Sequence, residues 1–232
     1  MVAAPAEARA VLAGFGCLNA VPAQWTPIGL CDGFDLLHCG VGKANAAGAT
    51  AQAIERLAPA RVLNLGICGA LPHAQRLQVG QSVLATRCLL ADEGIETQRG
   101  WIPLAEAGFP GAIDSDWVLP AAGFNRMLSS MADRSGVIAT VSSCSGSDAR
   151  AEEIARRCGG VGLAEAMEGG AIGLVAARHD IPFAELRVAS NRTGNRESQG
   201  WDLPLALRRV ENISARLARG LSADHRAESS LD

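Results

Sequence analysis

Short apolar runs alternate with longer stretches of helical periodicity along most of this chain. Each run ends at glycine, proline or a polar cluster, which is typical of strands buried in a sheet. Residues 2–4 are expected to be the end of a further short strand, which Pro5 terminates. The other predicted strands are Phe34–Cys39, Arg61–Leu65, Ser82–Ala91, Gly136–Val141 and Phe183–Ala189.

The stretches between these runs carry apolar residues at helical spacing. In the segment Pro120–Arg134, for example, Phe124 and Leu128 fall on one face. Residues 94–118 show no clear period and are predicted to be a long loop, as in a lid or an oligomer contact. The remaining predicted helices are Glu7–Phe15, a small-residue helix closing near Leu57, Ala149–Cys158 capped by Asp148, the segment after Gly169, and Leu203–Leu221.

This alternation, without a linker or an internal repeat, predicts one α/β domain over residues 1–221. Its central twisted sheet is expected to be mostly parallel or mixed and flanked by helices. Residues 222–232 are predicted to be a polar tail. A length of 232 residues with 48% hydrophobic residues suits a single domain with a sizeable core.

Charge and cysteine content exclude several classes of function. A net charge of −3 gives no electrostatic basis for binding nucleic acid or an anionic membrane. No apolar run is long enough to span a bilayer, and the start of the chain does not resemble a signal peptide. The seven cysteines include no CxxC pair, and the four histidines lack metal-ligand spacing. We therefore expect reduced thiols in a cytoplasmic protein, with no metal and no cofactor.

Two glycine-rich segments follow predicted strands. Gly40–Gly48 contains a GxGxxA pattern, but Glu55 lies inside the next helix rather than at a strand end, so a dinucleotide site is not favoured. The ending typical of a phosphate-binding Walker loop is also absent, and tight helix–sheet packing is the better interpretation. Gly66–Gly69 indicates that backbone closely approaches another group.

Polar side chains follow two of the apolar runs. Glu168 precedes a helix that starts at Gly169, and the cluster Ser190-Asn191-Arg192 follows the strand Phe183–Ala189. Because the carboxyl ends of strands in α/β sheets face the ligand crevice, we expect both groups to belong to one site.

The order of these motifs resembles the nucleoside phosphorylase/nucleosidase superfamily. The matching residues are Gly40-Val41-Gly42-Lys43-Ala44-Asn45-Ala46-Ala47, Asn64-Leu65-Gly66-Ile67-Cys68-Gly69 and Ala166-Met167-Glu168-Gly169-Gly170-Ala171. Within this superfamily, Thr140–Gly146, Ser190–Arg196 and Trp201-Asp202 are similar to the futalosine hydrolases of menaquinone biosynthesis. The resemblance covers nearly the whole chain and implies hydrolysis of the N-glycosidic bond of futalosine, with release of hypoxanthine.

The resemblance also implies three catalytic residues. Met167 and Glu168 match the pair that holds the ribose, where a carboxylate also favours the developing cation. Asn191 stands where adenine-specific nucleosidases carry aspartate, and its amide donors suit N7 and O6 of a 6-oxopurine. Glu7 aligns with the glutamate that activates water. Each of these residues also has a structural interpretation. Glu168 would stand at a helix N-terminus because the helix dipole favours an acid there, Asn191 would cap a turn, and Glu7 would be an ordinary glutamate in the first turn of a helix.

Other residues are expected to line the site on the same grounds. Arg192 or Arg196 is a candidate for binding the benzoate of futalosine, unless both lie at the surface or in a subunit contact. The remaining candidates for substrate binding are Cys68, Gly69, Ser143, Cys144 and Ser145. The only expected ligand is a small purine nucleoside, and the superfamily commonly forms homodimers or higher homo-oligomers, with Trp101 and Trp117 as candidate contacts.

Three other functions remain open at this point. Methylthioadenosine/adenosylhomocysteine nucleosidases and purine nucleoside phosphorylases share the motifs, and a nucleoside-binding protein without catalysis would retain them too. Hydrolysis is favoured over phosphorolysis on three grounds. Ile67 stands where phosphorylases and other nucleosidases of the superfamily often carry serine, no arginine is expected near the Gly66–Gly69 turn, and Glu7 would repel phosphate.

Overall fold

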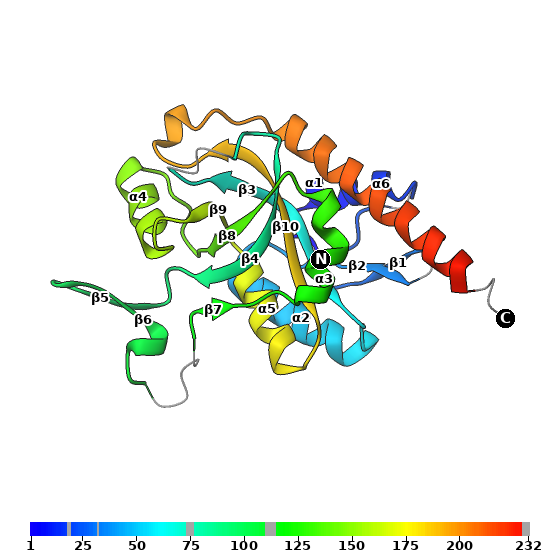
Figure 1. Cartoon of the computed structure of the whole chain (residues 1–232), viewed down its shortest axis with the longest axis horizontal. Helices are drawn as coiled ribbons and strands as arrows, with labels where there is room; N and C mark the ends of the chain where they lie inside the picture. Colours follow the sequence, from blue (N-terminus) through cyan, green and yellow to red (C-terminus); the bar gives the residue numbers. More distant parts are fainter. Residues whose placement is uncertain (18–19, 32, 73–76, 110–114, 229–232) are drawn as a thin grey trace.

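A closed mixed sheet forms the centre of the molecule (Figure 1). The computed structural model describes residues 1–17, 20–31, 33–72, 77–109 and 115–228. The order of the hydrogen-bonded strands is β10, β3, β9, β8 and β4. Strand β4 also pairs with β10, and this pairing closes the sheet. The two-residue strand β7 pairs with the outer part of β4. The principal strands are β3 (Val62–Ala70), β4 (Ser82–Leu90), β7 (Trp117–Val118), β8 (Arg134–Thr140), β9 (Gly162–Ala166) and β10 (Phe183–Arg192).

Strand directions make this sheet mixed. The pairs β10–β3, β4–β8 and β8–β9 are parallel, whereas β3–β9, β10–β4 and β4–β7 are antiparallel. The predicted class, one α/β domain with a mostly parallel or mixed sheet flanked by helices, is confirmed. Closure of the sheet was not predicted, because the apolar pattern of each strand carries no information about which strands pair at the edges.

Helices cover the sheet in two layers. In Figure 1, α2 lies beside α5 on one side, and α1 packs along α6 on the other. Each layer has its own apolar core, represented by Ile172 of α5 and by Val210 of α6. The helices are α1 (Pro5–Gly14), α2 (Lys43–Leu57), α3 (Ala122–Leu128), α4 (Asp148–Arg157), α5 (Gly169–Arg178) and α6 (Leu203–Glu228).

The first residues of the chain lie beside the sheet and form an isolated bridge rather than a full strand. Val2 makes a parallel bridge to His38, and the N–H of Leu65 donates to the Met1 carbonyl. Pro5 occupies the first turn of α1, where its missing N–H costs nothing. Glu7, three residues after the N-cap Ala4, accepts the N–H of that cap residue at 2.9 Å.

Several predicted boundaries were wrong. Strands β3 and β10 continue through residues 66–70 and 190–192, so the glycines and the polar cluster lie within strands and not in turns. The predicted helix Pro120–Arg134 is only the short α3 and a 3₁₀ turn, η2 (Ser129–Met131), and β8 already begins at Arg134. The last helix does not stop at Leu221, since its backbone continues to Glu228.

The segment 94–118 was predicted to be a loop, and this was also wrong. It contains a hairpin of β5 and β6, in which Gly100 follows the turn with a φ of +121°. A 3₁₀ turn and β7 come after the hairpin, and residues 110–114 lie outside the described part of the chain. A second small hairpin, β1 with β2, precedes α2. These elements are β1 (Ile28–Cys31), β2 (Phe34–Leu36), β5 (Gly94–Thr97), β6 (Gly100–Pro103), η1 (Leu104–Glu106) and η3 (Arg196–Ser198).

Candidate active site

A cavity of about 420 Å³ opens where β3, β9 and β10 end, beside the first turn of α1. Its walls come from segments far apart in the sequence. Nine of the eleven residues predicted for the site line this cavity: Glu7, Cys68, Gly69, Cys144, Ser145, Met167, Glu168, Asn191 and Arg196. Ser143 and Arg192 do not line it.

Glu7 is buried against the end of β3. Its Oε2 accepts the N–H groups of Ala3 and Ala4, both at 2.9 Å, and its Oε1 accepts the N–H of Ile67 at 2.8 Å. Burial raises the pKa of Glu7 above its ordinary value, outweighing the opposite effects of Arg187 and of the hydrogen bond from Ile67. A carboxylate held in this way has a fixed direction and an increased basicity.

Glu168 lies at the start of α5, and only 3% of its surface is exposed. Its Oε1 accepts the N–H of Gly42 at 3.0 Å, and its Oε2 accepts a hydrogen bond from Arg187 Nη2 at 3.0 Å. Gly40 and Gly42 have φ angles of +90° and +93°, which residues with side chains rarely adopt. The GxGxxA segment therefore directs an N–H at Glu168, in addition to the packing role predicted for it.

Arg187 is the cation at the centre of the site and was missed in the sequence. Its Nε donates to Glu185 Oε1 at 2.8 Å and its Nη1 to the Ile67 carbonyl at 3.4 Å, in addition to its contact with Glu168. Burial alone would lower the pKa of Arg187, but the carboxylates around it, led by that of Glu185, raise it. The side chain is 1% exposed and carries a full charge.

Gly66 permits this arrangement. A Cβ atom there would lie 2.4 Å from Glu7 Oε1 and 2.7 Å from Arg187 Nη1. The close approach predicted for Gly66–Gly69 is thus the approach of two charged side chains to β3. The expectation that no arginine lies near this segment was wrong, because Arg187 is distant in sequence but adjacent in the parallel pair β10–β3.

Asn191 lies on the opposite part of the wall, over Gly69. Its Nδ2 donates to the Arg192 carbonyl at 2.8 Å and lies 3.5 Å from Gln199 Oε1, while its Oδ1 accepts from the Ser190 hydroxyl at 3.0 Å. A Cβ atom on Gly69 would lie 3.4 Å from Asn191 Nδ2. The amide is therefore held in one orientation by its neighbours on β10 and by Gln199.

The loop after β8 contributes Cys144 and Ser145 to the cavity. Ser145 is bound to Glu165 of β9 by its N–H at 2.7 Å and by its hydroxyl at 2.6 Å. Ser143 is turned away, and its N–H lies 3.3 Å from Asp92 Oδ2. Burial raises the pKa of Cys68 to about 12, so this thiol on the cavity wall remains neutral.

The two candidate arginines of the 190–196 segment lie in different places. Arg192 donates to Gln78 Oε1 at 2.9 Å on the exterior. Arg196 lines the mouth of the cavity, with its guanidinium 5.0 Å from the ring centroid of Trp201. Asp148 is not the helix cap that was predicted, since Ser147 caps α4 and Asp148 accepts the N–H of Asn195 at 2.8 Å.

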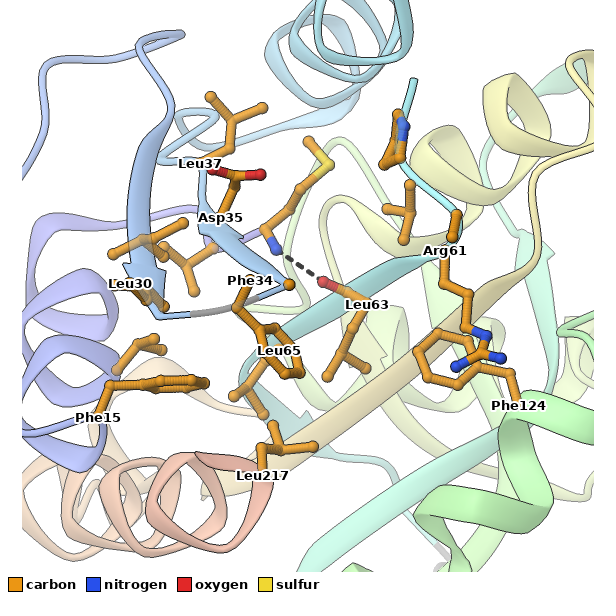
Figure 2. A pocket seen from close by; sticks show the side chains of 18 of the residues that line it. Phe15, Leu30, Phe34, Asp35, Leu37, Arg61, Leu63, Leu65, Phe124 and Leu217 are labelled. Carbon is orange, nitrogen blue, oxygen red and sulfur yellow. Dashed lines mark hydrogen bonds between the residues drawn. The ribbon is translucent and has the colours of Figure 1, made fainter. Parts of the chain in front are cut away.

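A larger cavity, of about 520 Å³, lies elsewhere (Figure 2). It is enclosed by the β1–β2 hairpin, α1, α6 and β3, and side chains such as Leu30, Phe34 and Leu217 make it mainly apolar. Of its described lining side chains only Asp35 and Arg61 are charged, and none is a predicted site residue. Size alone would favour this cavity, but acids, a buried cation and amides converge only on the smaller one.

Glu165, Gln199 and Trp201 also line the smaller cavity and were not predicted to do so. A charged pair inside an otherwise apolar strand, as in Glu185-Leu186-Arg187, was the available signal for Arg187. No comparable pattern in the sequence indicates Gln199, because this residue reaches the cavity from the irregular segment after β10. Among the residues that the structure describes, no cluster that could hold a metal ion occurs, and no helix is long and apolar enough to cross a membrane.

Comparison with known proteins agrees with this geometry. Residues 36–221 match the family described as the Phosphorylase superfamily. The chain belongs to this superfamily, and its relatives show that it is an N-glycosidic hydrolase. It is 36% identical to a futalosine hydrolase of Acidothermus cellulolyticus, over 94% of this chain and 88% of the relative, and 37% identical to one of Streptomyces coelicolor, over 81% and 79%.

Other relatives are nucleosidases of adenine substrates. A 5'-methylthioadenosine/S-adenosylhomocysteine nucleosidase of Oceanobacillus iheyensis is 32% identical, over 72% of each chain. Among solved structures, the corresponding nucleosidase of Helicobacter pylori, crystallised with butyl-thio-DADMe-Immucillin-A, superposes with a TM-score of 0.74 over 96% of both chains at 18% identity. This last likeness shows that the fold is shared.

Proposed function

We propose that the enzyme hydrolyses the N-glycosidic bond of futalosine, releasing hypoxanthine and dehypoxanthine futalosine in menaquinone biosynthesis in the cytoplasm. The observation that carries the proposal is the single cavity on which Glu7, Glu168 and Asn191 converge. The similarity to two futalosine hydrolases over most of each chain supports the choice of substrate.

Glu168 binds the ribose in this proposal. Gly42 and Arg187 each occupy one acceptor position of a different carboxylate oxygen, which leaves lone pairs for vicinal hydroxyl groups of the sugar. The negative charge also stabilises the oxocarbenium-like ribosyl group that forms as the base departs. Met167, which precedes Glu168 and lines the cavity, supplies apolar contact to the sugar.

Glu7 activates the attacking water. Three N–H groups hold its carboxylate, and one lone pair of Oε1 remains for a water molecule. Its raised pKa makes it a better base than an ordinary surface glutamate. Arg187, close to Glu7 across Gly66, acts against the effect of burial on the pKa of Glu7 and so favours its ionised form.

Asn191 recognises the base. Its amide donors suit the acceptors N7 and O6 of a 6-oxopurine, and the contact of Oδ1 with Ser190 keeps Nδ2 directed away from the Ser190 side. To bind the base, one N–H exchanges its longer contact with Gln199 Oε1 for the purine. A site built on such hydrogen bonds rejects the wrong base strongly.

Water rather than phosphate is the co-substrate in this proposal. Arg187 is already paired with Glu168 and Glu185, so its charge is not available to a phosphate ion. Glu7 adds negative charge on the same wall. Arg196 is the remaining arginine among the described lining residues, and at the cavity mouth it is suited to the benzoate of futalosine.

A substrate panel tests the proposal. The protein is incubated with futalosine, 5'-methylthioadenosine and inosine, with and without phosphate, and the released bases are separated by chromatography. We expect hypoxanthine from futalosine at a rate independent of phosphate. Strict phosphate dependence would exclude hydrolysis, and binding of futalosine without release of base would favour a non-catalytic nucleoside-binding protein.

The second candidate is a methylthioadenosine/adenosylhomocysteine nucleosidase. The relatives with that activity cover 72% of this chain, which is the observation in its favour. Rapid adenine release from methylthioadenosine, with little hypoxanthine from futalosine, would establish it instead.

A further inference from the structure

Glu185 is a buried acid that the proposed reaction does not use. It lies on β10 two residues before Arg187, it is 0% exposed, and it does not line the cavity. A substrate in the cavity therefore cannot touch it. Burying a further carboxylate beside a cation that Glu168 already neutralises is costly, because its oxygens are removed from water. Any role of Glu185 in the reaction must act through the residues that it contacts.

Four groups surround the Glu185 carboxylate. The Nε of Arg187 donates to its Oε1 at 2.8 Å, and the thiol of Cys88 donates to its Oε2 at 3.0 Å. The side-chain amide of Asn64 lies 3.4 Å from Oε1. Gly169, the first residue of α5, packs so closely that a Cβ atom there would lie 2.0 Å from Oε2. Glu185 is thus fixed in place, and of these four neighbours only Arg187 reaches the cavity.

Arg187 presents one guanidinium to three acids. Glu185 accepts its Nε–H, and Glu168 accepts from Nη2 at 3.0 Å. Glu7 lies on the remaining side, since a Cβ atom on Gly66 would lie 2.4 Å from Glu7 Oε1 and 2.7 Å from Arg187 Nη1. The Nη1 group donates instead to a backbone carbonyl of β3 at 3.4 Å, and among the described residues no ion pair joins Arg187 to Glu7. The cation is therefore close to Glu7 without being bonded to it.

Glu185 is placed to maintain this separation. It stands two residues from Arg187 on one strand, so both side chains point to the same face of the sheet, where Arg187 pairs with Gly66. We propose that Glu185 is a positioning residue for hydrolysis, which holds Arg187 against Glu168 and away from Glu7, so that Glu7 keeps a free acceptor position for the attacking water. This inference rests on the proposed function and deepens it, because it explains how one cation stabilises the ribose-binding acid without blocking the base.

Loss of the Glu185 charge would release Arg187 toward Glu7. The Nη1 group has two N–H donors and one long contact, so little opposes its rotation. A hydrogen bond from Arg187 would then occupy the acceptor position left for water, and an adjacent opposite charge lowers the pKa of a carboxyl group by about one unit or more. In the wild-type protein burial raises the pKa of Glu7, and Arg187 opposes this only in part. Turnover and the pKa of Glu7 should therefore fall together.

Several groups act directly on the pKa of Glu7. The titratable or charged ones are the side chains of Arg187, Glu168, Cys39 and Cys68 and the amino group of Met1. Burial raises the pKa of both thiols, to about 11 for Cys39 and about 12 for Cys68, so neither titrates in the acid range. Burial lowers the pKa of the Met1 amino group to about 6, so this group can titrate near the acid limb of the activity profile. The pKa of Glu7 must therefore also be measured on the residue itself.

The principal test is the pH profile of Glu185→Gln on futalosine. We expect kcat to fall about ten- to a hundredfold, as for an impaired general base, and KM to change little, because Glu185 does not reach the cavity. The midpoint of the acid limb of kcat/KM should move down by about one pH unit. An unchanged midpoint overturns the inference.

Two control variants accompany this measurement. Cys88→Ala removes a different partner of the same carboxylate, and Glu55→Gln removes the charge of an exposed glutamate on α2. Both should keep the midpoint of the wild type. The same displacement in Cys88→Ala would mean a general disturbance of the core and would count against the role of Glu185.

Glu185→Asp separates charge from reach, and it carries the test if Glu185→Gln does not fold in a thermal melt. The aspartate keeps the negative charge but is one methylene shorter, so its hold on Arg187 Nε is weaker. We expect a midpoint near that of wild type and a loss in kcat of about threefold or more, with KM unchanged. A kcat equal to that of wild type would show that the position of Arg187 does not depend on Glu185.

A titration without substrate separates this inference from the proposed function. Carbon-13 NMR follows the side-chain carboxyl signals of protein labelled at glutamate, and the signal of Glu7 is the one lost in Glu7→Gln. We expect the pKa of Glu7 to be about one unit lower in Glu185→Gln than in wild type. Equal values contradict the role of Glu185, whichever nucleoside is cleaved. If the pKa differs but futalosine is not hydrolysed, the proposed substrate is wrong and the positioning role stands.

Discussion

Arg187 donates to Glu168 at 3.0 Å inside the protein, where both side chains are nearly inaccessible to solvent. Arg187 belongs to β10, and Glu168 stands directly before α5. Arg187 also binds Glu185 and lies beside Glu7 across Gly66. One guanidinium thus connects the acid proposed for the ribose with the acid proposed for water.

Replacing Glu168 by glutamine is the most direct test of the ribose site. The change keeps the size of the side chain but removes the charge that stabilises the ribosyl cation. We expect kcat to fall about a hundredfold or more, with the fold retained. Steady-state kinetics on futalosine and a thermal melt check both parts. Activity near that of wild type would remove Glu168 from the mechanism.

Arg187→Met is expected to act chiefly on stability. It leaves Glu168 and Glu185 buried without their cation, and loss of one partner of a buried pair costs about 3–5 kcal/mol. The control is Arg209→Met, which breaks a half-exposed pair with Asp133 and should cost about 1 kcal/mol or less. Urea unfolding measures both, and similar values for the two variants would contradict the central role of Arg187.

The sequence predicted the parts of this site that are local in the chain. Glu168 could be recognised because the Met-Glu-Gly-Gly stretch stands directly before a helix, and both its place in the cavity and the fold class were predicted. Glu7 was placed by alignment, and it lies on the same cavity wall. What these residues do in catalysis stays a prediction.

The parts that depend on strand pairing could not be predicted. Arg187 lies beside Gly66 and Ile67 only because β10 pairs in parallel with β3, and Glu165 reaches the cavity beside Gly69 only because β9 pairs with the end of β3. Ser143 and Arg192 were predicted for the site because their neighbours belong to it. Each is turned outward toward another partner, Asp92 and Gln78 respectively.

Gly66→Ala tests whether the close approach at β3 matters. The added methyl group would overlap Glu7 Oε1 and Arg187 Nη1, so both must shift. We expect turnover to fall about a hundredfold, as for a displacement near 1 Å of a reacting group. Gly123→Ala is the matched control, because no atom lies within 4 Å of its added Cβ and it sits in α3. That variant should keep full activity and gain slightly in stability.

Asn191→Asp is expected to reduce the preference for a 6-oxopurine. An ionised aspartate offers no donor to N7 or O6, and it would face the Arg192 carbonyl at the place where Nδ2 now donates. The ratio of hypoxanthine to adenine released from futalosine and its 6-amino analogue measures the effect, which should exceed about tenfold. Asn212→Asp, on the exposed side of α6, serves as the control. An unchanged ratio would count against the proposed base contact.

The pH dependence of activity reports on Glu7. Because burial raises its pKa, Glu7 takes up a proton at a higher pH than an ordinary glutamate, and a protonated acid cannot activate water. We expect kcat/KM to fall with decreasing pH through a midpoint above about 4.3, the ordinary value. Glu7→Gln should abolish this fall and leave a low, nearly pH-independent rate, whereas Glu55→Gln should keep it.

Stability is expected to change in the opposite direction over the same interval. Between the unfolded pKa of Glu7 and its raised folded pKa, the folded protein holds a proton that the unfolded chain has released. The contribution of Glu7 to the free energy of unfolding therefore decreases as pH rises through that window. Urea unfolding at a series of pH values, with wild type and Glu7→Gln compared, isolates this contribution. If activity and stability rose together with pH, and the variant did not change the slope, Glu7 would not be the buried base proposed for this site.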